Sequence, residues 1–584
     1  MSKFIHLHTH SHYSLLDGLA KIDELVNEAC EYEMPALAIT DHGNMYGAIE
    51  FYKKAKKKRV KPILGVEAYV APRLLTQKEP HVDAKAFHLV LLAQNEEGYK
   101  NLLKLVSLSN LKGFYYKPRV DKQVLEENHK GIIAMSACLA GELPRLIEAD
   151  KFEEAKKSAL AYQDIFGKDK FYIEIGSHSN VANYNQIMNG LCKLSKETNI
   201  PLVATQDIHY LKKGDATAQD ALVAIQTNTT LSETNRLSLK DENYSFRSPN
   251  EMMSLLKDTP EAIANTVKIA EMCNVELKLG KWIFPNFKIP EGKTAESYLK
   301  ELTFLGLKKR SVKATENEIN KRIEYELGII NTKGYAPYFL IVADFVNEAK
   351  RRSIVTNTRG SAAGSFVSYL IGISDVDPLR YHLPFERFLN PFRPSPPDID
   401  MDFADDRRDE IIEYAKQRYG YEKVAQIGTF GTMMARGSVR DVTRVLGCGY
   451  TVGDRLAKMI PLGSQGFPMS IKKALSLNIE LKNAYESEDD AKKIIDLAQK
   501  IEGCVRHVSV HAAGVVISPD ELTNYSPLQK EPNGDKVITQ YDMHAVEDAG
   551  LLKFDFLGIK NLSILGRAMD IIEKIHNVNI DLAN

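Results

Sequence analysis

Three aspartates alternate with apolar residues in the stretch Pro397-Asp398-Ile399-Asp400-Met401-Asp402-Phe403. In a β-strand successive side chains point to opposite faces, so the three carboxylates would share one face at spacings of about 6.6 Å. Carboxylates so placed can bind divalent ions about 3.5–4 Å apart, the arrangement used for phosphoryl transfer. An exposed acidic edge strand is the alternative, and it is less favoured because Asp is depleted in strands. The spacing therefore predicts a metal site.

A second group of metal-binding residue types begins near the N-terminus, in Phe4-Ile5-His6-Leu7-His8-Thr9-His10-Ser11-His12. Its four imidazoles would lie on one face of a strand, and imidazole is the commonest metal ligand. Similar residue types lie at or just beyond other expected strands: Asp17, Asp41, His42, Glu67, His88, Cys138, Asp207 and His209. Parallel strands bring such ends together at one mouth. For Cys138 taken alone, a small buried thiol is the alternative.

The elements expected to position these residues alternate strand-like and helical runs. Strand-like runs fall at 4–8, 36–40, 62–69, 89–92, 131–135, 171–175 and 202–205, with amphipathic stretches such as 22–32 and 97–107 between them. This βα pattern predicts a parallel sheet or barrel. A Pro- and Gly-rich break at 277–293 marks the main domain boundary. Beyond it, strand-like runs on both sides of a helical region at 433–503 predict a helical insertion in a sheet domain.

A turn of small residues, Arg359-Gly360-Ser361-Ala362-Ala363-Gly364-Ser365, precedes the acidic strand. Small residues let backbone N–H groups approach phosphates, and the Arg359 guanidinium offers a fork for phosphate oxygens. Such a turn is by itself more often an ordinary loop. Near paired aspartates it predicts a cradle for a triphosphate.

A second acidic strand is expected at 551–558, where Lys553 and Asp555 share one face. Asp555 would complete a carboxylate triad, or it is an Asp satisfied at a strand end. Arg436, Arg440 and Arg444 recur every four residues on an expected helix. This row could follow a DNA backbone or form a solvated basic face, and the pattern does not separate the two.

Composition limits the class of protein. A chain of 584 residues exceeds one hydrophobic core and predicts roughly three to five domains. With 44% hydrophobic and 26% charged residues it is globular, and a net charge of −1 gives no overall attraction to nucleic acid, so any such binding needs local basic patches. Six scattered cysteines without a CxxC pair, and no signal-like N-terminus, predict a reducing, cytoplasmic location without membrane insertion.

The N-terminal residues resemble the PHP (polymerase and histidinol phosphatase) family of distorted βα barrels with a metal cluster at one end. The resemblance implies nine ligands: His8, His10, Asp17, His42, Glu67, His88, Cys138, Asp207 and His209. It implies a Zn²⁺, Mn²⁺ or Fe cluster, bridged by Glu67, that activates water against a phosphoester. His6, His12 and Asp41 are expected to be supporting or structural residues.

Several motifs extend this resemblance along the chain. Their order is Arg359–Ser365, Phe385–Pro391, Pro397–Phe403, Thr429–Thr432, Arg440–Val442, His511–Val516 and Lys553–Gly558. It resembles the bacterial C-family replicative DNA polymerases (DNA polymerase III alpha subunit, DnaE type). This implies a multidomain α/β chain: a PHP domain at 1–275, a polymerase beta-like palm at 276–432 and 511–560, a helical thumb at 433–510, and the start of the fingers at 561–584.

The same resemblance implies DNA-directed DNA synthesis, with two Mg²⁺ ions in the palm. Asp400, Asp402 and Asp555 would be the catalytic metal-binding triad, with Asp398 in a supporting role, and Arg359, Ser361, Gly364 and Lys553 would face the incoming triphosphate. The implied partners are primer-template DNA and dNTPs, and in the full-length family a sliding clamp and other replisome subunits.

Two departures from the family pattern affect these expectations. Thr356 and Thr358 stand where the family has Gly-x-Gly, which predicts an altered cradle because β-branched residues resist positive φ. The chain also ends where the family continues into fingers, so weak synthesis by this chain alone is expected. Two other functions stay open: a PHP-centred phosphoesterase, either a 3′→5′ exonuclease or a pyrophosphatase, and a non-catalytic PHP scaffold.

Overall fold

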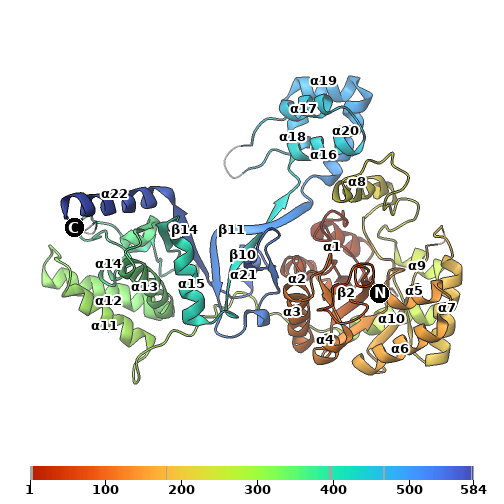
Figure 1. Ribbon diagram of the computed structural model, residues 1–584, viewed down its shortest axis with the longest axis horizontal. Helices are drawn as coiled ribbons and strands as arrows, with labels where there is room; N and C mark the ends of the chain where they lie inside the picture. Colours follow the sequence, from red (N-terminus) through yellow and green to blue (C-terminus); the bar gives the residue numbers. More distant parts are fainter. Residues whose placement is uncertain (1–3, 179, 393–396, 464–466, 581, 583–584) are drawn as a thin grey trace.

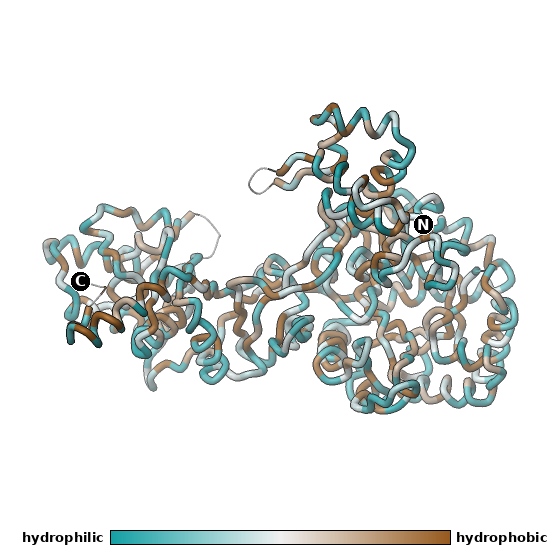
Figure 2. Tube along the Cα trace, turned by 45° about the horizontal axis from the view of Figure 1, so that its top comes forward, coloured by the Kyte–Doolittle hydropathy of each residue, from teal (hydrophilic) through white to brown (hydrophobic). Residues whose placement is uncertain are grey.

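The computed structural model describes residues 4–178, 180–392, 397–463, 467–580 and 582. The molecule is elongated, with an N-terminal α/β domain at one end and the C-terminus near the other (Figure 1). A lobe of helices lies at the tip of a long two-stranded ribbon, on the side of the N-terminal domain. Hydrophobic and hydrophilic segments interleave along the trace in every part of the chain (Figure 2). No described helix combines the length and the apolar character needed to cross a bilayer.

The N-terminal domain is built on a seven-stranded sheet in the order β1-β2-β3-β5-β6-β7, with β4 beside β2. Its strands are β1 (Ala36–Ile39), β2 (Lys61–Val70), β3 (Phe87–Ala93), β4 (Arg119–Val120), β5 (Ile132–Met135), β6 (Phe171–Ile175) and β7 (Leu202–Ala204). Its helices are α1 (Ile22–Glu31), α2 (Ala48–Lys57), α3 (Glu96–Leu111), α4 (Lys122–Glu127), α5 (Glu142–Glu148), α6 (Phe152–Phe166), α7 (Tyr184–Thr198), α8 (Ala216–Thr227), α9 (Pro249–Leu255) and α10 (Pro260–Met272).

The expectation of an all-parallel sheet is wrong at one strand, because β3 is antiparallel to both β2 and β5. The cause is the connection from β2 to β3, which contains no helix. A parallel neighbour needs a crossover connection that is usually helical, whereas antiparallel neighbours can be joined by a loop. The pairs β1–β2, β5–β6 and β6–β7 are parallel, as expected.

The His-rich N-terminal segment does not form the regular strand that was expected; it makes one isolated bridge, from Thr9 to Ile208. Its backbone is nevertheless held on both sides. Thr40 N donates to Thr9 O (2.9 Å), and His10 N donates to Ile208 O (2.8 Å). The segment therefore lies between β1 and the chain that follows β7, joining the two edges of the sheet.

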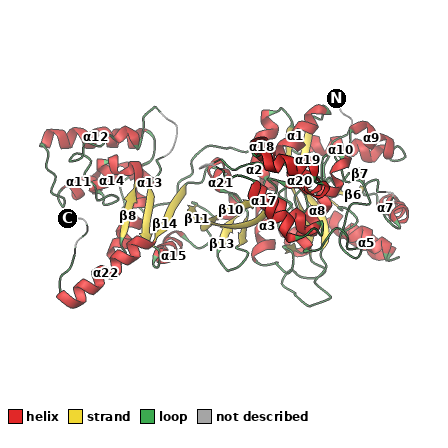
Figure 3. Ribbon diagram, turned by 90° about the horizontal axis from the view of Figure 1, so that it is seen from above, coloured by secondary structure: helices red, strands yellow, loops and turns green. Residues whose placement is uncertain are grey.

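A second sheet has the order β12-β13-β10-β11-β14-β9-β8. Its strands are β8 (Thr356–Arg359), β9 (Asp400–Ala404), β10 (Val424–Thr432), β11 (Val505–Ile517), β12 (Leu528–Lys530), β13 (Val537–Thr539) and β14 (Lys553–Ile559). The accompanying helices are α11 (Ala295–Leu307), α12 (Glu316–Thr332), α13 (Ala336–Arg351), α14 (Phe366–Leu370), α15 (Arg408–Tyr419), α21 (Met543–Asp548) and α22 (Lys560–His576). In Figure 3 the strands form a band from α11–α14 toward the N-terminal domain.

The helical lobe is inserted between strands β10 and β11, as the sequence pattern predicts. It consists of α16 (Ala435–Val445), α17 (Tyr450–Met459), α18 (Ile471–Leu477), α19 (Ile479–Ser487) and α20 (Asp489–Ile501). Helices α16 and α20 pack against α8 of the N-terminal domain in one buried cluster, to which Leu222, Val439 and Ile494 belong. The lobe is thus anchored on the N-terminal domain as well as on the ribbon.

The N-terminal domain shares a hydrophobic core with the β10–β13 end of the second sheet, whereas β9, β14 and helices α11–α15 contribute to a separate buried cluster. Residues of the N-terminal domain and of the β10–β13 end, among them Leu102 and Tyr541, belong to the same buried cluster. The hydroxyl groups of Tyr99 and Tyr541 lie 2.5 Å apart across this boundary, and Leu528 N donates to Ser107 Oγ (2.9 Å). The two parts therefore form a continuous folded unit.

Candidate functional site

All nine predicted ligands of the N-terminal site lie in one cluster, which is centred on the carboxylate of Glu67. Its Oε1 lies 3.2 Å from His8 Nε2, 2.8 Å from His88 Nδ1 and 3.7 Å from Cys138 Sγ. Its Oε2 lies 2.5 Å from His42 Nδ1. Glu67 is on β2 and is 1% exposed, so a buried carboxylate stands between imidazoles from three parts of the chain.

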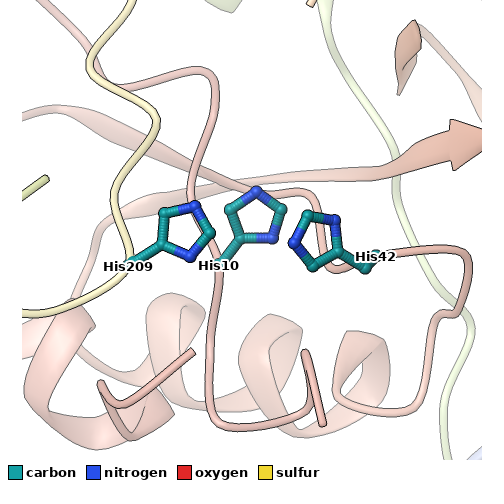
Figure 4. A group of neighbouring side chains, drawn as sticks. All are labelled: His10, His42 and His209. Carbon is teal, nitrogen blue, oxygen red and sulfur yellow. The ribbon is translucent and has the colours of Figure 1, made fainter. Parts of the chain in front are cut away.

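Asp207 and Asp17 complete the cluster on the other side. Asp207 Oδ1 lies 3.3 Å from the Nε2 atoms of His8 and His10 and 3.4 Å from His209 Nε2. Asp17 reaches His209 Nδ1 (3.3 Å) through Oδ1 and His42 Nε2 (3.0 Å) through Oδ2. Figure 4 shows the ring of His10 between those of His42 and His209, with centroid separations of 4.0 and 4.5 Å.

Burial and neighbouring charges shift the pKa values of the histidines in this cluster in opposite directions. Burial, together with His42 and His209, lowers the pKa of His10 to about 3. Burial also acts to lower the pKa of His42 and His209, but Glu67 and Asp17 raise that of His42 to about 9, and Asp17 and Asp207 raise that of His209 to about 10. Adjacent imidazoles therefore differ widely in proton affinity.

Several buried atoms of the cluster lie close to their neighbours without making a hydrogen bond. They are His42 Nδ1, Glu67 Oε2, Asp207 Oδ1 and His209 Nδ1. Buried polar atoms are normally hydrogen-bonded, so unsatisfied ones need an explanation, such as an ion. The donor set of imidazoles and carboxylates is one that transition metals accept. The residues present thus fit a metal cluster.

His6 and His12 lie outside the cluster, so the expectation of four imidazoles on one face holds only for His8 and His10. His6 Nε2 is 2.8 Å from Arg247 O, and the His12 ring packs on Tyr13 at 4.4 Å. The chain turns after His10 because Ser11 N donates to Asp41 Oδ1 (2.7 Å).

Asp41 supports His10 indirectly, as a residue outside the ligand set. Its Oδ1 accepts a hydrogen bond from Ser14 Oγ (2.7 Å), and the Ser14 hydroxyl lies 2.9 Å from His10 Nδ1. This chain of bonds orients the His10 ring so that Nε2 faces the cluster.

A cavity of about 530 Å³ opens beside the cluster. Asp17, His42, Asp207 and His209 line it together with residues that the sequence did not single out: Glu174, His178, Tyr184 and Tyr244. Of these only Glu174 carried a usable signal, since it is a charged residue within the otherwise apolar run Phe171–Ile175.

The second site lies on one face of the second sheet. Strands β9 and β14 are parallel, and Asp400 pairs directly with Asp555. Met401 and Phe403 point to the other face, where they are buried; there Phe556 packs on Phe345 of α13 at 5.1 Å. Alternation along β9 thus separates an apolar face from an acidic one, as predicted from the spacing.

The carboxylates of this site form two sets. Oxygen atoms of Asp398, Asp400 and Asp555 lie within 4.8 Å of one another, and burial, followed by the charges of Asp398 and Asp555, raises the pKa of Asp400. One oxygen of Asp555 is buried without a hydrogen bond. Asp402 is engaged elsewhere: Arg359 Nε lies 2.5 Å from its Oδ2 and Nη2 lies 2.9 Å from its Oδ1. The crowded set fits a cation.

Lys553 and Arg359, predicted to face a triphosphate, both contact carboxylates of this site. The Lys553 ammonium group pairs with Asp555. Asp398 precedes β9 and is exposed, so spacing alone did not place it beside Asp555. The two cations stand next to the aspartates that would hold metal ions.

The small-residue turn forms a short 3₁₀ helix, η2 (Gly360–Gly364), directly after β8. Gly360 has a φ of +81°, a region that favours glycine. Gly364 is small for a packing reason, because a Cβ there would lie 2.7 Å from Pro384 O. Ser361 is exposed on the same turn.

The turn is held from behind by the buried carboxylate of Glu326 on α12. It accepts hydrogen bonds from the backbone N–H groups of Phe366 (2.9 Å) and Val367 (3.0 Å) and from Ser365 Oγ (2.9 Å). Arg322 Nε lies 2.6 Å from Glu326 Oε1. This network sets the position of η2 relative to α14.

Thr356 and Thr358 were expected to alter the phosphate cradle because β-branched residues resist positive φ, but they do not adopt such a conformation. Both lie in β8, where neither has a positive φ and where β-branched residues are favoured. Thr358 Oγ1 donates to Ile373 O (2.6 Å). The stated reason for an altered cradle therefore does not apply.

Arg436, Arg440 and Arg444 lie on α16 but do not form a free basic row. Arg436 Nε donates to Ile460 O (2.8 Å), and Arg440 pairs with Asp454 (2.9 Å). Arg444 donates to Asn228 Oδ1 (3.0 Å) of the N-terminal domain. Each guanidinium contacts a neighbouring group of the protein, and its contact with a DNA backbone stays a prediction.

Comparison with known families defines the class of protein. Residues 6–178 match the PHP domain, and residues 297–558 match the bacterial DNA polymerase III alpha NTPase domain. The chain is therefore an α/β protein in which a PHP domain precedes a polymerase alpha NTPase domain. The two sites described above fall one in each matched region.

Proteins of one name are similar to nearly the whole chain. DNA polymerase III subunit alpha of Borreliella burgdorferi is 46% identical over 579 residues, covering 98% of this chain and 50% of the relative. The Thermus aquaticus protein of that name is 41% identical (99% and 52% covered), and that of Bacillus subtilis 42% (100% and 50%). The chain is similar along nearly its whole length to DNA polymerase III alpha subunits, and it spans about half the length of these relatives. Among solved structures, an amidohydrolase from Chromobacterium violaceum aligns at 15% identity and a TM-score of 0.23, covering 35% of this chain and 87% of that one.

Proposed function

We propose that this chain is the PHP, palm and thumb part of a replicative DNA polymerase catalytic subunit. Its palm site would transfer nucleotides from dNTPs to the 3′-hydroxyl of a primer. The observation that carries the proposal is the parallel pairing of Asp400 with Asp555, with Asp402 two residues further along β9. Three carboxylates so arranged on a rigid sheet suit two-metal chemistry.

Each residue of the palm site has a role in this proposal. Asp400, Asp402 and Asp555 would hold two Mg²⁺ ions, which supply charge to stabilise the attacking hydroxyl and the leaving pyrophosphate. Arg359 and Lys553 would exchange their carboxylate partners for phosphate oxygens of the incoming nucleotide. Backbone groups of η2, with Ser361 and Gly364, would border the triphosphate.

Single-turnover addition of one matched dNTP to a primer-template, with protein in excess over DNA, tests this function without requiring processive synthesis. We expect incorporation that depends on Mg²⁺ and on the template base. Incorporation that ignores the template base, or none at any Mg²⁺ concentration, would contradict the assignment to this chain.

The finer architecture is proposed on the same basis. The seven-stranded N-terminal sheet, joined at its edges by residues 6–10, would be the distorted PHP barrel; the second sheet would be a polymerase beta-like palm and the helical lobe the thumb. This proposal includes the domain limits 1–275, 276–432, 433–510 and 511–560, with the fingers beginning at 561. It also includes a sliding clamp and the replisome as partners, and a cytoplasmic location. Of these ranges, residues 1–3, 179, 393–396, 464–466, 581 and 583–584 lie outside the described structure.

A second candidate function is metal-dependent phosphoester hydrolysis at the PHP site. The convergence of nine ligand-type residues beside a cavity of about 530 Å³ favours it. Bound Zn²⁺, Mn²⁺ or Fe would activate water there. The test is metal analysis of the purified protein, followed by hydrolysis of a 3′-terminal phosphodiester and of pyrophosphate with Mn²⁺ or Zn²⁺. Bound metal without hydrolysis would leave the domain as a scaffold, a role that the shared core with the palm also suits.

A further inference from the structure

The strand β6 carries a buried carboxylate that is not one of the nine ligand-type residues. Glu174 lies near the carboxyl end of this strand, among Phe171, Tyr172, Ile173 and Ile175, and is 3% exposed. Its neighbours on both sides are parallel strands, so it lies at the edge where Cys138 follows β5 and Asp207 follows β7. A charged group buried there requires specific partners.

Those partners connect Glu174 to the metal centre at one point. Its Oε1 lies 2.7 Å from His8 Nδ1 and accepts a hydrogen bond from Thr205 Oγ1 (2.6 Å). Its backbone N–H donates to Ser136 Oγ (2.9 Å). Ser136, just after β5, thus holds the backbone of Glu174, and Thr205, just after β7, binds the carboxylate oxygen that lies against the imidazole of His8.

This contact determines which nitrogen of His8 faces the cluster. A carboxylate oxygen accepts a hydrogen bond, so the Nδ1 atom of His8 carries a proton and Nε2 is the nitrogen that would bind a metal ion once it has lost its own proton. His8 Nε2 points at the cluster, 3.2 Å from Glu67, 3.2 Å from His10 Nε2 and 3.3 Å from Asp207. The ring is therefore oriented with Nε2 toward the cluster before any ion binds.

We propose that Glu174 is a positioning residue of the N-terminal metal centre, holding His8 in the tautomer and orientation that present Nε2 to a metal ion. The inference rests on the proposed PHP metal site. Ligating histidines commonly donate their other N–H to a carboxylate, and loss of such a partner costs about 10- to 100-fold in metal affinity. Thr205 acts on the same oxygen, so its hydroxyl limits rotation of the Glu174 carboxylate.

A purely structural role for Glu174 predicts a different outcome. A buried carboxylate that only satisfied its neighbours would affect the free energy of unfolding but not the affinity of the folded protein for metal. The two roles are separated by measuring metal affinity and metal-free stability on the same variants.

The experiment uses the purified full chain, stripped with a chelator and titrated with Zn²⁺ or Mn²⁺ against a competing chelator. Glu174→Ala should lower metal affinity about 10- to 100-fold. Glu174→Gln, whose carbonyl still accepts from Nδ1 and whose volume is preserved, should lower it less, and Thr205→Val should have the smallest effect. Glu28→Gln is the matched control, because Glu28 is a buried carboxylate (5% exposed) of the same domain that pairs with Lys212 away from the cluster.

The outcomes are distinct. Unchanged affinity in both Glu174 variants, with tight binding by the unsubstituted protein, overturns the positioning role and leaves the metal centre standing. An equal loss in Glu28→Gln shows a general effect of buried charge and also overturns the proposal. No metal binding by the unsubstituted protein overturns the metal centre itself. If Glu174→Ala does not fold, the metal affinities of Glu174→Gln and Glu28→Gln are compared instead. A larger loss in Glu174→Gln supports the positioning role, and an equal loss overturns it.

Discussion

Arg359 donates two hydrogen bonds, of 2.5 and 2.9 Å, to the carboxylate of Asp402 on β9. Two residues earlier on the same strand, Asp400 pairs with Asp555 of β14. The side chain of Asp402 is 3% exposed and that of Arg359 is 52% exposed. A half-exposed guanidinium thus neutralises a buried carboxylate of the proposed palm triad. A metal ion at Asp402 and the Arg359 side chain would compete for the same oxygens.

This competition predicts the effect of removing Arg359. Arg359→Ala should raise the affinity of the palm for Mn²⁺ about two- to fivefold, corresponding to about 0.5–1 kcal/mol for a half-exposed ion pair. The same change should weaken dNTP binding, because the guanidinium would no longer be available to phosphate oxygens. Mn²⁺ titration followed by electron paramagnetic resonance measures the first effect. Arg380→Ala, an exposed arginine outside the site, is the control; a lower Mn²⁺ affinity in Arg359→Ala would argue against competition.

The PHP cluster predicts a stability that depends on pH when metal is absent. The pKa values of His42 and His209 are raised from 6.5 to about 9 and about 10, since burial is outweighed by the neighbouring carboxylates. The folded protein therefore binds more protons than the unfolded chain, and this stabilisation is complete below about pH 6.5 and lost as the pH rises toward 9–10. Bound metal replaces those protons, so the alkaline loss should disappear and metal affinity should rise over that range.

Urea unfolding across that pH range, with and without Zn²⁺ after treatment with a chelator, measures this behaviour. If the free energy of unfolding depends on pH in the same way with and without Zn²⁺, the metal does not displace protons from these imidazoles.

The network behind the small-residue turn predicts a large loss of stability when Glu326 is truncated. Glu326→Ala would leave two backbone N–H groups, the Ser365 hydroxyl and the Nε atom of Arg322 without their acceptor. We expect a destabilisation of about 3–5 kcal/mol, typical of breaking a buried ion pair. Chemical denaturation measures it, with Glu324→Ala as the control because Glu324 is exposed on the same helix. A loss no greater than that of the control would contradict the role assigned to the network.

The shared core predicts that the N-terminal domain and the β10–β13 end of the second sheet unfold together. Tyr541 is fully buried at their boundary, and Tyr541→Ala should cost about 3–5 kcal/mol through the cavity it leaves. Tyr541→Phe removes only the contact with Tyr99 and should cost about 0.5–1.5 kcal/mol. Calorimetry should show one transition for these regions that moves as a whole. Tyr421→Ala, at an exposed position, is the control; a shift confined to one of two separate transitions would contradict the shared unit.

Alternation and spacing in the sequence located both sites, because periodicity within one strand is a local property. The two aspartates of β9 and the helical insertion were predictable in this way, whereas the set of nine ligand-type residues came from the resemblance to the PHP family. Contacts between distant segments were not predictable in this way. Three features depend on such contacts. They are the antiparallel direction of β3, the position of His12 outside the metal cluster after Ser11 binds Asp41, and the short distance between Asp398 and Asp555.

The arginines of α16 show the same limit. Their spacing of four residues was compatible with a nucleic-acid surface, but Ile460, Asp454 and Asn228 hold them through contacts that the sequence does not reveal. Glu174 is the opposite case, a functional candidate that was overlooked although a lone carboxylate in an apolar strand marks it.

Single-turnover incorporation of one dNTP by the aspartate variants tests the central claim most directly. The account predicts that Asp400→Asn, Asp402→Asn and Asp555→Asn each lower the rate by roughly 10³-fold, the upper range for loss of one preorganised electrostatic group, whereas Asp398→Asn keeps most of it. Unchanged incorporation by Asp400→Asn or Asp555→Asn would contradict a catalytic palm. Loss in Asp398→Asn with retention in Asp402→Asn would replace the proposed triad by Asp398, Asp400 and Asp555, the set whose oxygens lie within 4.8 Å of one another.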